Sequence, residues 1–410
     1  MSKLAINGGA KACTATFPGW PIWDETDCTA VADVVRSGQW WSVGGTKVKE
    51  FEQAFAEYQG AKHGICVPNG TISLLVALQA VGVRAGDEVI VTPYTFIASA
   101  SSIVQANAIP IFVDIDPDTM NISPAAIEAA ITDKTKAIMV VHMGGMPADM
   151  DAIMDIARKH NLKVIEDAAQ AHGASWRGKG VGSIGDAGSF SFQASKNLTA
   201  GEGGIITTCD EKVADRAWSI HNVGRVKGGA WYEHPMLGSN YRMTEFQGAI
   251  LLTQMKKLDA ETKLRNENGL RLAARLDKTG IVKTQKRDER VTSHAYHVFI
   301  TRYLGEESTG VPREKFMAAV NAEGVSVTDG YLPLYRSGMF ELDQSSCPLG
   351  CGFYGKTVNY AELSLPNCER LCDHEQMWLS QSQMLGTREA VDQIADAFEK
   401  VVENIGELKD

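Results

Sequence analysis

The 410-residue sequence has no apolar run that approaches membrane-spanning length. Its first residues lack the continuous apolar segment and the small-residue cleavage site of a signal peptide. Basic residues are not in excess either, because the formal net charge is −10, and a nucleic-acid partner would require clustered basic residues. We therefore expect a cytoplasmic protein with neither a membrane nor a nucleic acid as partner.

Cysteine is also sparse, because eight cysteines in a chain of this length are too few for a disulfide scaffold. The spacings between Cys347 and Cys351 and between Cys368 and Cys372 fall in the range of structural zinc sites, and His374 lies close by. The intervening residues lack the tight turn that such sites usually contain. The sequence therefore favours free, buried thiols and no metal.

Long linkers and low-complexity segments are missing, so the chain should fold throughout, and its length favours two closely packed domains. From about residue 47 to residue 210, helical patterns alternate with short apolar runs rich in Val and Ile. This alternation is typical of parallel strands connected by crossover helices. The expected strands are 64–67, 88–91, 111–113, 137–142, 164–167, 188–192 and 204–208.

The alternation stops after about residue 243, where 244–276 has the pattern of one or two long helices. Further on, 294–301 and 325–328 are expected strands, whereas 313–323 and 388–402 are expected helices. The prediction is an α/β protein with a large domain over residues 1–250, built on a mostly parallel sheet, and a smaller α+β domain over residues 251–410.

Ligands of parallel α/β sheets bind beyond the carboxyl ends of the strands, and polar residues gather at three such ends. Asn69, Gly70 and Thr71 follow one strand and open a helix, whose free N–H groups can bind phosphate. Glu166 and Asp167 end another strand and point to opposite sides of it. Taken singly, these features also fit an ordinary helix cap and a solvated acid.

Lys196 follows a third strand and lies among small and apolar residues. Loss of solvation there would lower the pKa of its amine and make it a better nucleophile toward a carbonyl carbon. A lone lysine in a loop is otherwise a surface charge.

Together these segments resemble the DegT/DnrJ/StrS family of sugar aminotransferases, which depend on pyridoxal 5′-phosphate (PLP) and have the fold-type I, aspartate-aminotransferase architecture. The resemblance spans nearly the whole chain. Its motifs are Asn69-Gly70-Thr71, Thr95-Phe96 with Ala98-Ser99, 113–116, 147–151, Glu166-Asp167-Ala168-Ala169-Gln170, Ser191-Phe192 with Lys196, Gly201-Glu202-Gly203-Gly204 and 238–245.

The resemblance implies roles for residues around the cofactor ring. Lys196 would bond covalently to the cofactor and, once displaced by an incoming amine, move the proton between the substrate carbon and C4′. Asp167 would pair with the pyridine nitrogen, and Gln170 would lie near the ring oxygen. Phe96 would stack on the ring face, ahead of Tyr94.

The resemblance also implies a phosphate site and a second subunit. The backbone of Gly70 and Thr71 and the hydroxyl of Ser191 would hold the phosphate, together with Asn240 from a neighbouring copy. A site shared in this way implies a homodimer. Substrate contacts are implied for Trp40, His142, Arg225, Arg242 and Tyr331, although packing of the tryptophan and surface ion pairs of the arginines explain these residue types equally well.

The resemblance favours a ping-pong aminotransferase that moves an amino group from glutamate or glutamine to a keto-sugar or a keto-cyclitol similar to scyllo-inosose. No basic cluster suited to a nucleotide diphosphate is evident, which favours a free cyclitol or simple sugar. Segments 17–21, 38–41 and 142–144 also resemble 3-amino-5-hydroxybenzoate synthases, so dehydration with aromatisation is the alternative. A regulator without turnover is disfavoured, because Lys196 and Asp167 are both present.

Overall fold

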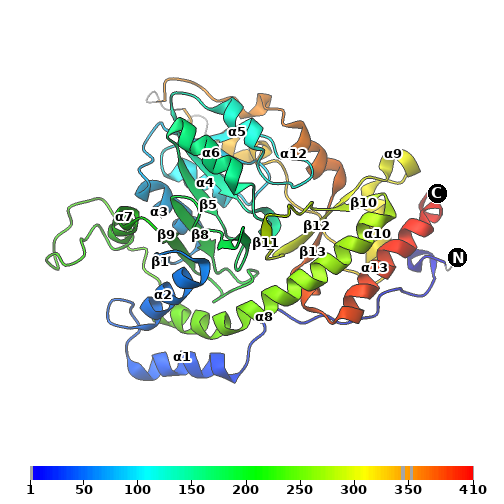
Figure 1. The fold of residues 1–410 in the computed structure, drawn as a ribbon, viewed down its shortest axis with the longest axis horizontal. Coiled ribbons are helices and arrows are strands. Elements are labelled where there is room, and N and C mark those ends of the chain that lie inside the picture. Colours follow the sequence, from blue (N-terminus) through cyan, green and yellow to red (C-terminus); the bar gives the residue numbers. More distant parts are fainter. Residues whose placement is uncertain (1–2, 343–346, 351–353, 410) are drawn as a thin grey trace.

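The computed structural model describes residues 3–342, 347–350 and 354–409. A seven-stranded sheet forms the centre of the larger part of the molecule, with helices on both of its faces (Figure 1). Neighbouring strands are parallel except for β9, which is antiparallel to both of its neighbours. The prediction of a mostly parallel α/β sheet is confirmed. The order across the sheet is β1 (His63–Val67), β9 (Gly204–Thr208), β8 (Ala187–Ser191), β5 (Lys163–Asp167), β4 (Thr135–Val141), β2 (Glu88–Val91) and β3 (Ile109–Phe112).

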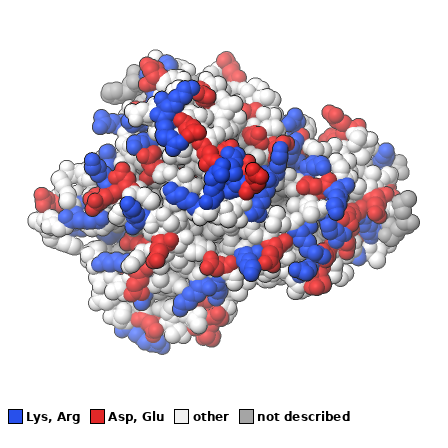
Figure 2. All heavy atoms as spheres, in the orientation of Figure 1, with Lys and Arg blue, Asp and Glu red and all other residues white. Residues whose placement is uncertain are grey.

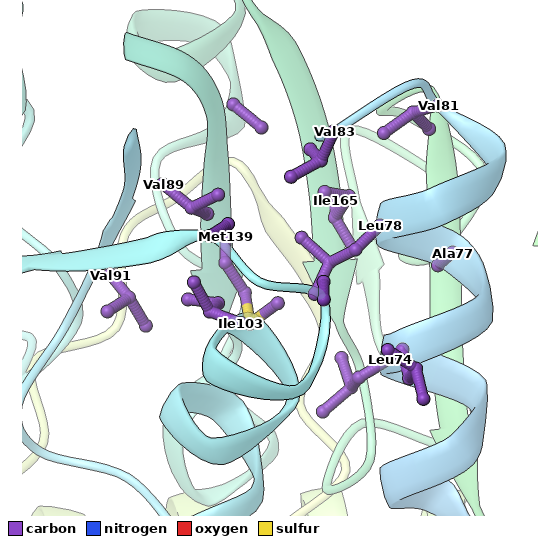
Figure 3. Close-up of a cluster of buried hydrophobic side chains, with 14 of the residues drawn as sticks. Leu74, Ala77, Leu78, Val81, Val83, Val89, Val91, Ile103, Met139 and Ile165 are labelled. Carbon is purple, nitrogen blue, oxygen red and sulfur yellow. The ribbon is translucent and has the colours of Figure 1, made fainter. Parts of the chain in front are cut away.

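Alternate side chains of each central strand are buried under helices on opposite faces, because successive side chains of a strand point to opposite sides. Val89 and Val91 pack in the same cluster as Leu78 and Ile103, whereas Ile90 belongs to the cluster on the other face. Figure 3 shows Leu78 and Ile103 directed from their helices toward strand side chains of the first cluster. The helices on this face are α3 (Gly70–Ala80), α4 (Ala98–Gln105) and α7 (Glu211–His221).

The opposite face is covered by two pairs of helices. Ile127 and Ile153 cover the central strands, while Phe51, Phe55 and Leu258 pack over the strands nearer to β1. This double coverage explains why the strands appear in the sequence as continuous apolar runs rather than as alternating patterns. The helices are α5 (Pro124–Ala130) with α6 (Met150–His160), and α2 (Lys47–Gln59) with the first half of α8 (Glu245–Leu276).

Helix α8 is one continuous helix and connects the two parts of the molecule (Figure 1). Thr244 caps its first turn in a capping box with Gln247, which explains why the helix begins there. Helix α1 (Glu25–Ser37) packs along it, and the buried Asp27 accepts hydrogen bonds from the side chains of Thr253 and Gln254.

The smaller part is built on a three-stranded antiparallel sheet, and Phe299, Phe316 and Phe398 are buried in its core. The predicted strand 294–301 begins only at Val298, and within 325–328 only Thr328 forms a bridge, to Trp378. The elements are β10 (Val282–Thr284), β12 (Val298–Tyr303), β13 (Gln376–Ser380), α9 (Glu306–Thr309), α10 (Arg313–Ala322), α11 (Gly338–Leu342), α12 (Pro366–Arg370) and α13 (Arg388–Glu403), and a third small sheet is formed by β11 (Val291–Ser293), β6 (Ser175–Trp176) and β7 (Lys179–Gly180).

The two hydrophobic cores do not follow a single cut in the sequence. Leu4 packs in the core of the smaller part, so both chain ends lie on that side (Figure 1). Conversely, Tyr335, Phe340 and Tyr360 belong to the core of the larger part. The domain boundary between residues 250 and 251 stays a prediction. A segment before it packs in the core of the smaller part, and segments after it pack in the core of the larger part.

Within the described ranges, no helix is both long and apolar enough to cross a membrane. Acidic and basic side chains intermingle over the face of the molecule drawn in Figure 2. This mixed surface accords with a net charge of −10 that is spread over many residues.

Candidate active site

Lys196 and Asp167 lie at the carboxyl ends of two adjacent parallel strands, β8 and β5. Asp167 is the last residue of β5, and Lys196 follows β8 in a turn in which its N–H bonds to the Gln193 carbonyl. Burial lowers the pKa of the Lys196 amine to about 8, and the charge of Asp167 opposes this shift only in part. A far larger fraction of this amine is uncharged near neutral pH than of a surface lysine, as a nucleophile requires.

The carboxylate of Asp167 is buried and has few partners. It accepts hydrogen bonds from the Ser99 hydroxyl at 2.7 Å and from the Ala169 N–H at 3.2 Å. Burial nevertheless raises its pKa, although these bonds and the charge of Lys196 act in the opposite direction. A buried carboxylate with two neutral donors retains the capacity to bind a cation placed beside it.

Ser99 is a member of the site to which the sequence assigned no role. It lies near the start of α4, and its hydroxyl is also 2.9 Å from that of Thr95. A serine in the first turn of a helix after a parallel strand is the signal that could have identified it, because such helix starts meet the ends of neighbouring strands.

Glu166 points to the opposite side of β5 from Asp167, as strand alternation predicts. It accepts a hydrogen bond from His142 Nε2 at 3.0 Å and three more from backbone N–H groups. His142 Nδ1 accepts from the Ala148 N–H, and the side chain has 0% exposure. Both ring nitrogens of His142 therefore have protein partners, and this burial counts against the predicted contact with substrate.

Gly70 and Thr71 begin α3 next to the end of β8. The Asn69 side chain caps the Ile72 N–H, while N–H groups of the first turn have no partner within a helix. A Cβ on Gly70 would lie 2.6 Å from the Ser191 Cβ, so only glycine allows this close approach. The helix start and the Ser191 hydroxyl thus form a small cradle suited to an anion.

Two further residues predicted to bind the cofactor are Phe96 and Gln170. Phe96, which precedes α4, is 55% exposed, so much of its side chain is free to contact a ligand. The Gln170 side chain accepts from the Gly144 N–H at 2.8 Å and donates to the Tyr331 hydroxyl at 3.1 Å. Tyr331 therefore contacts Gln170, a residue predicted to bind the cofactor. Tyr94, in contrast, is fully buried and its hydroxyl donates to Gln376.

Two of the predicted substrate residues lie elsewhere, beside the loop that follows α7. Arg225 and Arg242 line a cavity of about 240 Å³ together with Trp231, and Lys196 and Asp167 are not among its lining residues. The Arg225 guanidinium lies 3.9 Å from the Trp231 ring centre. Trp40 is outside this cavity and packs on Phe246.

Asn240 lies on the surface at the end of this loop, which projects from the body of the molecule at the left of Figure 1. Its backbone pairs with Asn222, but its side chain forms no hydrogen bond within the part of the chain that the structure describes. Asn240 is therefore available to a second molecule.

The cysteines predicted to be free lie partly outside the described residues. Cys368 and Cys372 are buried with their sulfur atoms 3.9 Å apart, whereas Cys351 falls in a range that is not described. Among the described residues, no group of three or more His, Cys, Asp or Glu side chains is arranged to hold a metal.

Residues 21–399 match the model of the DegT/DnrJ/EryC1/StrS aminotransferase family. The chain is 42% identical to a protein from Streptoalloteichus tenebrarius named "Putative L-glutamine:3-amino-2,3-dideoxy-scyllo-inosose aminotransferase", with 100% of both chains covered. It is 38% identical to the L-glutamine:scyllo-inosose aminotransferase of Streptomyces griseus, with 99% of each chain covered.

Two solved structures place this fold among known enzymes. A 3-amino-5-hydroxybenzoic acid synthase superposes with a TM-score of 0.85 at 32% identity, covering 96% of this chain and 100% of that one. NtdA from Bacillus subtilis, solved with the bound cofactor PMP, gives a TM-score of 0.78 at 28% identity, covering 92% of this chain and 82% of the other.

Proposed function

This chain belongs to the DegT/DnrJ/EryC1/StrS aminotransferase family, and from that membership we propose that it transfers the amino group of L-glutamine to a keto-cyclitol of the scyllo-inosose type. The proposal includes PLP as cofactor and a ping-pong order of the two substrates. The names of relatives that match over the full length support both the donor and the acceptor. Amino transfer itself follows from the family.

The observation that carries the proposal is the position of Lys196 and Asp167 at the carboxyl ends of the adjacent strands β8 and β5. A buried amine whose pKa falls to about 8 is suited to react with an aldehyde. A buried carboxylate with only two neutral donors is suited to the protonated ring nitrogen of PLP. The residues present therefore fit this cofactor at both its reactive carbon and its ring nitrogen.

The cradle of Gly70, Thr71 and Ser191 fits the phosphate of PLP, because a helix start and a hydroxyl both favour an anion. Phe96 is exposed and suited to lie against a flat ring, and Gln170 is suited to the ring hydroxyl. These are the same residues that the sequence assigned to cofactor binding.

Bound in this site, PLP supplies an aldehyde that exchanges amines and a ring that withdraws electrons from the amino-bearing carbon. Lys196 Nζ would be the base that takes up the proton of that carbon and the acid that returns it to the aldehyde carbon of the cofactor. Asp167 would keep the ring nitrogen protonated, and the hydrogen bond from Ser99 orients the Asp167 carboxylate. Glu166, which also bonds to His142, lies on the other side of β5 and fixes the end of this strand to the backbone of 182–185.

A second copy of this chain would complete the site in this proposal. The loop after α7 carries apolar side chains that are largely exposed, with Tyr232 at 87% and Leu237 at 94%. Large apolar side chains exposed on one loop fit a protein interface. Asn240 at the end of the same loop is assigned to the phosphate bound by the partner, which makes the homodimer the active form.

Dehydration with aromatisation is a second candidate, because the structure of a 3-amino-5-hydroxybenzoic acid synthase superposes with a TM-score of 0.85. The two reactions differ in their products, since only the second creates an aromatic ring with strong ultraviolet absorbance. Both require the same lysine and cofactor, so only a product assay separates them.

The test is to incubate the PLP-loaded protein with scyllo-inosose and either L-glutamine or L-glutamate, and to identify products by mass spectrometry. Amino-inositol formed with L-glutamine supports the proposal, and its absence with every donor would contradict it. Lys196→Ala should give no product, whereas Lys212→Ala, at an exposed lysine, should match the unaltered protein. Formation of an aromatic product from a suitable keto acid would favour the second candidate instead.

A further inference from the structure

The segment that carries Tyr331 lies along β13 of the smaller part of the molecule. The backbones of Thr328 and Trp378 exchange two hydrogen bonds, at 3.0 Å and 2.8 Å. Gly330 approaches the same strand so closely that a Cβ on it would lie 2.1 Å from the Gln376 Oε1. The chain is therefore packed tightly against β13 immediately before Tyr331.

Two side chains of β13 hold Tyr331 in place. Gln376 Nε2 donates to the Tyr331 carbonyl at 2.6 Å, and the Trp378 ring meets the Tyr331 ring edge to face with centres 4.7 Å apart. Tyr94 orients both of these side chains, because its hydroxyl donates to Gln376 Oε1 at 2.9 Å and accepts from Trp378 Nε1 at 3.0 Å. Tyr94 and Gln376 are fully buried, so water does not compete for these bonds.

The Tyr331 hydroxyl contacts Gln170, which follows β5 in the turn after Asp167. Gln170 Nε2 donates to this hydroxyl at 3.1 Å, and its Oε1 accepts from the Gly144 N–H at 2.8 Å. The orientation of the amide is determined by these partners, because a flipped amide would place its NH₂ group against the Gly144 N–H, donor against donor. Tyr331 thus connects β13 to a residue predicted to bind the cofactor.

Two protons of this pair remain available to a ligand. Gln170 Nε2 carries two protons and gives one to Tyr331, whose hydroxyl accepts it and directs its own proton elsewhere. In the ranges that the structure describes, neither Nε2 of Gln170 nor the Tyr331 hydroxyl has a further hydrogen-bond partner. Burial raises the pKa of Tyr331 to about 12, and the charge of Asp167 acts in the same direction, so the hydroxyl stays protonated near neutral pH.

We propose that Tyr331 is a positioning residue of the cofactor site: its hydroxyl accepts one Nε2 proton of Gln170, so that the other is directed to the ring oxygen of PLP. Gln376 and Trp378 enable this role by fixing Tyr331 from β13. The inference rests on the proposed binding of PLP. It differs from the substrate contact expected for Tyr331, because Tyr331 acts here through Gln170.

The effect on the cofactor follows from the charge of the ring oxygen. A hydrogen-bond donor stabilises negative charge on an oxygen. With Gln170 held in place, the ring oxygen of lysine-bound PLP attracts the proton on the neighbouring nitrogen less strongly. The visible absorbance of lysine-bound PLP should therefore change form at a lower pH than it would without this donor.

The test is a double-variant comparison. Tyr331→Phe removes the hydroxyl and keeps the ring against Trp378, whereas Gln170→Ala removes the amide. The double variant shows whether Tyr331 acts through Gln170, because residues that act through one another have non-additive effects. Tyr303→Phe is the matched control, since Tyr303 is another buried tyrosine, whose hydroxyl donates to the Val311 carbonyl at 2.9 Å in the core of the smaller part.

Two quantities are measured for each protein: the pH midpoint of the visible band after loading with PLP, and the PLP dissociation constant by equilibrium dialysis. In Tyr331→Phe the midpoint should rise by about half a pH unit and the dissociation constant by about three-fold. Gln170→Ala should change both quantities more, and adding Tyr331→Phe to it should change neither further. Tyr303→Phe should match the unaltered protein.

Equal changes on adding Tyr331→Phe with and without Gln170 would overturn the inference, since Tyr331 would then act on the ring or on Asp167 directly. Unaltered values in Tyr331→Phe would overturn it as well. A general loosening of the fold would weaken PLP binding in both backgrounds and leave the midpoint unchanged, which also counts against the inference. Where a midpoint lies outside the pH range in which the fold is stable, the dissociation constants decide by the same comparison.

The unaltered protein separates this inference from the proposed function. If it shows no visible band with PLP, the proposed function fails and the inference fails with it. If it shows the band and Tyr331→Phe leaves both quantities unchanged, only the role of Tyr331 is refuted.

Discussion

The Glu166 carboxylate offers the sharpest test of what stabilises the end of β5, the strand that carries Asp167. Its Oε1 accepts from the Ile184 and Gly185 N–H groups at 2.7 Å each, and its Oε2 accepts from the Gly182 N–H at 2.7 Å and from His142 at 3.0 Å. All four partners are donors, so the position requires a side chain with acceptors on both branches.

Glu166→Gln keeps the shape but turns one branch into a donor. The amide oxygen can serve two of the four donors, and the other two then face an NH₂ group. Each buried donor left without an acceptor costs about 1–3 kcal/mol, so the free energy of unfolding should fall by about 2–6 kcal/mol. The size of this effect follows from the count of donors and not from the loss of charge alone.

Urea unfolding followed by tryptophan fluorescence at pH 7 measures the effect. Glu128→Gln is the control, because Glu128 is an exposed acid paired with Lys159 and should leave the midpoint unchanged. A loss of less than about 1 kcal/mol in Glu166→Gln would refute the reasoning, since even one unsatisfied buried donor exceeds that amount.

The same carboxylate predicts a pH dependence of stability. Burial alone would raise the pKa of Glu166, but the bonds from His142, Gly185 and Gly182 outweigh burial and hold the pKa below its ordinary value. The folded pKa is therefore lower than the unfolded one. Its contribution to stability is present above the unfolded value of about 4.3 and is lost as the pH falls through the folded value.

Three further predictions concern the site and its assembly. Lys196→Ala should lack the visible absorbance of lysine-bound PLP and show no turnover, and a variant that retains both would contradict the assignment of Lys196. Asn240→Ala should retain PLP less well, and mixing it with Lys196→Ala should restore part of the activity through one intact site in a mixed dimer; no recovery would count against the shared site. At pH 7 about a tenth of the Lys196 amine should be uncharged, which is about 300 times the fraction of a lysine of ordinary pKa, so its reaction with PLP should be faster than that of a surface lysine, and rates measured by stopped-flow absorbance should rise with a midpoint near 8.

The sequence predicted the central sheet closely because its strands are buried on both faces. The bounds of β2 and β9 agree with the expected 88–91 and 204–208. It did not predict that β9 runs antiparallel, because an apolar run carries no information about strand direction. It also placed the start of β12 four residues early, since His294 and Tyr296 have strand-like composition but form a stacked turn.

In the candidate site, too, some residues could be predicted from the sequence and others could not. Lys196, Asp167 and Gly70 lie at strand ends, where a rule for parallel sheets places ligands, and the family motifs identified them individually. The partner of Asp167, Ser99, depends on how α4 is oriented against β5, which local sequence does not encode. His142 was expected to meet substrate because the family resemblance implied this contact, but its buried side chain bonds to Glu166 instead.

The central claim, that Lys196 binds PLP and exchanges it with an amino donor, is tested most directly by an absorbance spectrum. The purified protein is loaded with PLP, and the spectrum is recorded before and after addition of L-glutamine. The account predicts a visible band that converts to a near-ultraviolet band of pyridoxamine phosphate when L-glutamine is added. No visible band after addition of PLP, or a band that responds to no amino donor, would contradict it.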